Sequence, residues 1–171
     1  LAFEEEANDG VSLAATIREA AARDPASLPL LSFLLDELYR RDVERDGGNM
    51  LTYASYRTLG MLEGAIARHA DELAAGLPSE LAAALDPLLL SLVQVDEISG
   101  TTTARLIKQA IIVDPLQREA ADRLVAGRLA VADDPGDGRT LRLAHEALLG
   151  HWPRLTRLIE EHRDFLIVRR R

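Results

Sequence analysis

The feature that most restricts the fold is a change of hydrophobic period in the second half of the sequence. Residues 79–93 (SELAAALDPLLLSLV) carry apolar residues at the three-to-four spacing of a helix. The segment GTTTARLIK, at 100–108, is short and rich in β-branched residues, which is typical of a strand. Residues 114–128 return to helical spacing behind an Asp-Pro cap. The chain is therefore expected to be mainly α-helical with a small β component.

A β-hairpin and a final helix complete this half of the chain. Segments 129–134 (LAVADD) and 139–145 (RTLRLAH) alternate apolar and polar residues around PGDG, which is turn chemistry. The last segment predicts one long helix that Pro153 kinks or restarts. One stripe of this helix consists of Leu148, Trp152, Leu155, Ile159, His162 and Leu166, with His162 expected at the surface or at the edge of the stripe. Helix, short strand, helix, hairpin and final helix is the order of a winged helix.

The first half of the sequence has helical patterns only. Amphipathic spacing predicts one helix over residues 11–24 and another over residues 29–46, which ends at Gly47-Gly48. Pro29 suits the first turn of the second helix, where its missing N–H costs nothing. Two shorter helical segments follow, at residues 52–60 and 62–78. This half is therefore expected to form a helical bundle.

The net charge of −8 is distributed unevenly along the chain. Residues 139–171 hold eight Arg against four acidic residues, so this end carries about +4 and the first 138 residues about −12. A net-acidic chain repels the phosphate backbone that supplies most non-specific affinity, so nucleic acid is not an expected partner.

Neither a membrane span nor a disulfide is indicated. No apolar run approaches the ~18 residues of a transmembrane helix, so a membrane is not an expected partner. The sequence has no cysteine, which excludes disulfides and thiolate metal sites and fits a reducing compartment. We therefore expect a cytoplasmic protein. Because the sequence begins at Leu1 and ends within a helical pattern, we interpret it as part of a longer chain.

His145 lies where the hairpin gives way to the final helix. Leu141 and Leu143 share one face of the preceding strand and Arg142 the other, so strand parity turns His145 toward protein. Glu146 then opens the helix, where free N–H groups and the positive end of the dipole would suit phosphate. The alternative is a structural histidine bonded to a backbone carbonyl. The residues alone leave both interpretations open.

No catalytic or metal-binding residue is predicted. His145 and His151 are six residues apart, roughly 240° around a helix, so they do not readily share a metal. The sequence contains no Gly-rich phosphate loop and no nucleophile elbow. The chain by itself is therefore expected to be no enzyme and to hold no cofactor.

Three segments together carry a family resemblance: SLPLLSFLLDELYRR, LTYASYRTLGMLEGAIARHADEL and LRLAHEALLGHWPRLTRLIEEHRDFL. They resemble the downstream half of the bacterial STAND NTPases, signal-transducing P-loop ATPases that are often fused to WD40 repeats. In that family a nucleotide-binding domain precedes a helical domain, a winged-helix domain and sensor repeats. The resemblance implies a lid-type helical domain over residues 1–59 and a winged-helix domain with a long C-terminal helix over residues 60–171.

The resemblance also implies two nucleotide-binding residues. In related apoptotic and plant-resistance proteins, a Gly-x-Pro motif places its proline against adenine, and residues 27–29 (SLP) are similar. Those proteins also have a Met-His-Asp motif whose histidine contacts the β-phosphate of ADP, and residues 144–146 (AHE) resemble it. Pro29 and His145 are thus implied to bind nucleotide, but only together with the NTPase core. Met61 departs from a glycine pair common in the bacterial relatives.

The function implied is that of a regulatory segment of a nucleotide-switched ATPase. It would close over ADP held by an upstream NTPase core and control signalling or assembly. ADP or ATP with Mg would be cofactors of the parent protein. The upstream NTPase domain and the downstream sensor repeats would be its partners, and an oligomer on activation is compatible with the resemblance.

Two alternative functions come from different classes of protein. One is a DNA-binding winged-helix regulator that reads DNA with residues 115–128 and uses Arg139 and Arg142 on the wing. Against it, Glu119 and Asp122 lie within that helix and make its outer face nearly neutral. The other is a purely protein–protein interaction module.

Overall fold

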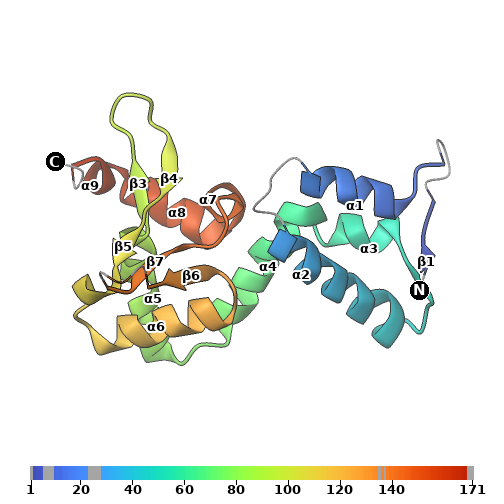
Figure 1. The fold of residues 1–171 in the computed structure, drawn as a ribbon, viewed down its shortest axis with the longest axis horizontal. Helices are drawn as coiled ribbons and strands as arrows, with labels where there is room; N and C mark the ends of the chain where they lie inside the picture. Colours follow the sequence, from blue (N-terminus) through green and yellow to red (C-terminus); the bar gives the residue numbers. More distant parts are fainter. Residues whose placement is uncertain (1, 6–9, 23–27, 135, 137, 169–171) are drawn as a thin grey trace. The chain divides into compact units, whose positions relative to one another are not determined.

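The computed structural model describes residues 2–5, 10–22, 28–134, 136 and 138–168, with only the backbone described for residues 28–30 and 168 (Figure 1). Helices account for most of the described residues and the sheets are small, so the mainly α-helical class is confirmed. The chain divides into two compact units, residues 1–68 and 69–171. This division falls within one helix, α4 (Met61–Ala75). The assignment of a lid-type helical domain to residues 1–59 and of a winged-helix domain to residues 60–171 stays a prediction.

The first unit is built from helices and one short pair of strands. Its described elements are β1 (Ala2–Phe3), α1 (Leu13–Ala22), α2 (Leu28–Tyr39), the π-helical segment η2 (Arg40–Arg45), β2 (Met50–Leu51), α3 (Tyr53–Thr58) and the first part of α4. The strands β1 and β2 pair in parallel, with Ala2 opposite Met50. Helix α2 continues directly into η2, and Gly47, with φ 70°, follows its end as the Gly-Gly pair predicts.

Apolar residues at helical spacing form the core of the first unit. Ile17 of α1 and Leu34 and Leu38 of α2 are buried, as their periodicity predicts. Tyr53 at the start of α3 is buried too, and its hydroxyl lies 2.7 Å from Thr16 Oγ1 of α1. Apolar packing and this hydrogen bond therefore hold α1 and α3 together.

A tight turn joins α3 to α4. Gly60 has φ 77° and Met61 has φ 62°, so two consecutive residues adopt the left-handed conformation. A Cβ atom at Gly64 would lie 2.7 Å from the carbonyl oxygen of Leu59. The close approach of α4 to the end of α3 therefore requires glycine at position 64.

The second unit combines helices with two small sheets. Its described elements are the rest of α4, α5 (Ser79–Ser91), β3 (Val93–Val95), β4 (Thr102–Ala104), β5 (Ile107–Lys108), the 3-10 turn η3 (Gln109–Ile111), α6 (Pro115–Ala126), β6 (Ala130–Asp133), β7 (Thr140–Leu143), α7 (Ala147–His151), α8 (Pro153–Glu161) and α9 (Arg163–Val168). Helix α5 packs against α6. The three-stranded sheet has the order β5-β7-β6, and both pairings are antiparallel.

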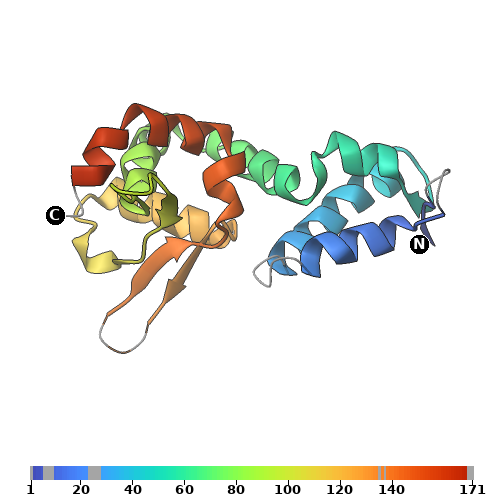
Figure 2. The ribbon, with the colours of Figure 1, turned by 90° about the horizontal axis from the view of Figure 1, so that it is seen from above.

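The hairpin predicted around PGDG is present as β6 and β7 (Figure 2). Its register places Ala130 opposite Leu143 and Asp133 opposite Thr140. Helix α6 starts as its Asp-Pro cap predicts, because the carboxylate of Asp114 accepts a hydrogen bond of 2.9 Å from the amide of Leu116.

The prediction of a single strand over residues 100–108 is wrong. The segment contains two strands in different sheets: β4 pairs with β3, and β5 pairs with β7. Asp96 and Gly100 (φ 68°) turn the chain, so that residues 93–95 pair with 102–104. Beyond β4 the amide of Arg105 donates to the carbonyl of Leu92 at 2.7 Å. The chain then continues into the second sheet at β5.

The last segment forms three helices and not the single long helix that its spacing predicts. Pro153 restarts the helix as the first residue of α8, because Trp152 is extended, with φ −88° and ψ 107°. A second interruption at His162 separates α8 from α9, and the His162 side chain is exposed, as expected for a residue at the surface or the edge of the stripe. The other stripe residues are buried: Leu148, Trp152, Leu155, Ile159 and Leu166.

Candidate nucleotide-contact residues

His145 lies two residues beyond the end of β7, in the second unit. The amide of Ala144 donates to the carbonyl of Leu129 at 2.9 Å, which extends the hairpin contact up to His145. Leu141 and Leu143 are buried, and the His145 side chain is 5% exposed. The inward orientation predicted from strand parity is therefore confirmed.

The helix that follows His145 is short and uses two of its first-turn amides within the protein. Helix α7 has five residues. The amide of Leu148 donates to the carbonyl of His145 at 3.3 Å, and the amide of Leu149 to that of Glu146 at 2.9 Å. These two N–H groups are thus already used within the turn, and so short a helix has little dipole. The anion site at this helix start stays a prediction.

Pro29 belongs to the first unit and is the second residue of α2, the first-turn position that the sequence predicts. Its side chain lies outside the described residues, as does Ser27. The nucleotide-binding roles of Pro29 and His145 both stay predictions.

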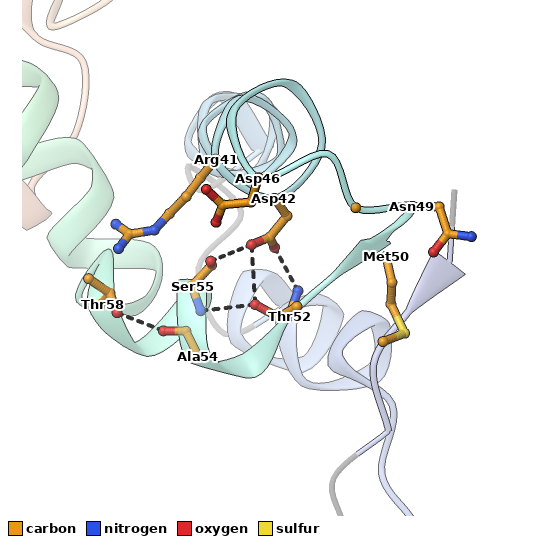
Figure 3. A pocket seen from close by; sticks show the side chains of 10 residues that line it. Arg41, Asp42, Asp46, Asn49, Met50, Thr52, Ala54, Ser55 and Thr58 are labelled. Carbon is orange, nitrogen blue, oxygen red and sulfur yellow. Dashed lines mark hydrogen bonds between the residues drawn. The ribbon is translucent and has the colours of Figure 1, made fainter.

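The first unit contains a cavity of about 450 Å³ between η2 and α3 (Figure 3). It is lined by Arg41, Asp42, Asp46, Gly48, Asn49, Met50, Thr52, Ala54, Ser55 and Thr58. Asp42 is the buried charged residue among them, with 5% of its surface exposed.

The hydrogen bonds of Asp42 give it a structural role. Its carboxylate accepts from the Thr52 amide at 2.7 Å, from the Thr52 hydroxyl at 3.2 Å and from the Ser55 hydroxyl. Thr52 in turn caps α3, because its hydroxyl accepts from the Ser55 amide at 3.1 Å. Asp42 therefore joins η2 to the first turn of α3, and these bonds occupy its carboxylate within the protein.

Sequence reasoning missed Asp42 and its cavity. The segment RRDVERD has the composition of a solvent-exposed helix end, and a π-helical turn has no sequence pattern that distinguishes it from an α-helical one. One signal was present: Thr52, with Ser55 three residues later, marks the start of a helix. The hydroxyl of such a cap residue can also donate a hydrogen bond to a nearby carboxylate.

The charged side chains on α6 form contacts within the second unit. Arg123 lies 3.4 Å from Glu119, and Arg139 lies 4.0 Å from Asp122. Arg118 Nε donates to the carbonyl of Ile112 at 2.7 Å. These contacts give the helix a nearly neutral outer surface, which does not favour DNA as a partner.

The described residues offer no candidate for a metal site or a membrane-spanning helix. Within the parts of the chain that the structure describes, no three His, Asp or Glu side chains are grouped so that they could hold a metal ion. In the same parts, no helix combines the length and the apolar character needed to cross a membrane.

Comparison with known proteins gives one family. The model of the family described as Novel STAND NTPase 1 matches residues 5–171. No curated protein and no solved structure gives a significant match. The family match covers almost the whole chain and agrees with the resemblance of its three segments. The chain belongs to the Novel STAND NTPase 1 family.

Proposed function

We propose that this chain is the regulatory helical and winged-helix part of a nucleotide-switched STAND ATPase. The observation that carries the proposal is that a family of NTPases matches residues 5–171, although the chain contains no Gly-rich phosphate loop. The loop that supplies most phosphate contacts in P-loop enzymes thus has to lie elsewhere in the parent protein. A segment of such a family without that loop is suited to regulate nucleotide binding.

The arrangement of the second unit supports the winged-helix part of this proposal. Helix α5, strand β5, helix α6 and the β6–β7 hairpin follow one another along the chain. The sheet order β5-β7-β6 places the strand that precedes α6 against the second strand of the hairpin. In this interpretation α6 is the recognition-type helix and the β6–β7 hairpin is the wing.

The proposed mechanism is that of a lid. ADP is held by the NTPase core, and His145, at the end of β7, hydrogen-bonds its β-phosphate while Pro29 packs on the adenine. Exchange of ADP for ATP then releases the winged helix and permits signalling or assembly. A ligand shifts such a switch only by the difference between its affinities for the two states, so ADP has to bind the closed state more tightly.

Calorimetry with ADP and Mg²⁺ tests this proposal. The chain of 171 residues is expected not to bind ADP at micromolar concentrations, whereas the parent protein with its phosphate loop is expected to do so. Micromolar binding by the chain of 171 residues would contradict the proposal. Sequence-specific binding of duplex DNA that persists at physiological salt would favour the DNA-binding alternative instead.

A further inference from the structure

We draw no further inference here: the strongest candidate, the polar cavity between η2 and α3 in the first unit, carries none, because its buried carboxylate, Asp42, is already bonded to Thr52 and Ser55 and nothing in the structure shows what ligand the cavity would hold.

Discussion

At the scale of single residues, Trp152 stabilises the second unit in two ways. Its side chain is fully buried, and its indole Nε1 donates to Asp71 Oδ1 of α4 at 2.7 Å. Because it is also extended at the break before Pro153, it fixes where α8 begins. Trp152 thus connects the start of α8 to α4.

Substitution of Trp152 is expected to be among the most damaging changes in the chain. Trp152→Ala should lower the free energy of unfolding by about 3–5 kcal/mol, because it leaves a large cavity in a packed core. Denaturant unfolding followed by circular dichroism measures this. Trp152→Phe retains most of the apolar volume and should lose less. A native emission maximum typical of a water-exposed indole would contradict the burial on which this prediction rests.

Asp42 is expected to contribute to stability through the cap of α3. Asp42→Asn replaces one carboxylate oxygen by an amide donor and breaks at least one of the hydrogen bonds from Thr52 and Ser55. The free energy of unfolding should fall by about 1–3 kcal/mol. Asp46→Asn, at an exposed residue that lines the same cavity, is the control and should cost less than about 0.5 kcal/mol. Equal effects of the two substitutions would show that Asp42 has no special role.

At the scale of elements, the start of α4 contains backbone strain. Met61 has φ 62° and a half-exposed side chain. The left-handed conformation therefore costs free energy that burial of this side chain offsets only in part. Met61→Gly should therefore raise the free energy of unfolding by about 0.5–1 kcal/mol, after the greater chain entropy of glycine in the unfolded state is subtracted. Met61→Ala retains the Cβ atom and should give no gain. Thermal unfolding distinguishes the two, and a stability loss in Met61→Gly would contradict the strain argument.

Elements that local signals define could be predicted from the sequence. Helix α6 follows from Asp114-Pro115 and its spacing, and the β6–β7 hairpin from alternation around a turn, because both depend on residues close together in the chain. The pairing of β3 with β4 and of β5 with β7 could not be predicted, since neighbouring residues of one β-branched segment join different sheets. Periodicity alone also cannot locate the break at His162, because the apolar spacing continues through it.

In the candidate site, too, the sequence predicts the features that depend on neighbouring residues and misses those that depend on more distant contacts. Strand parity was sufficient to predict that His145 points inward, because it needs only the two leucines before it. The anion site expected at the start of the next helix stays a prediction, although the amides of Leu148 and Leu149 already bond to carbonyl groups of the same turn. The Asp42 cluster depends on contacts between residues ten and thirteen positions apart across a turn, for which local spacing gives no signal.

At the scale of the whole molecule, the family and the charge distribution limit the function. The chain belongs to the Novel STAND NTPase 1 family, and its own sequence has no phosphate loop. Its net charge of −8 and the internal ion pairs of α6 oppose a DNA-binding role. The proposed role as a regulatory part of a larger ATPase is consistent with these features.

The proposed function requires that this chain close over ADP through His145. The most direct measurement is the ADP affinity of the parent protein, by calorimetry, with and without His145→Ala. Loss of one hydrogen bond to phosphate should cost about 1–3 kcal/mol, or roughly 5- to 150-fold in affinity, and should shift the resting population toward the open form. Unchanged ADP affinity together with a large drop in melting temperature would contradict the claim and identify His145 as a structural histidine between β7 and α7.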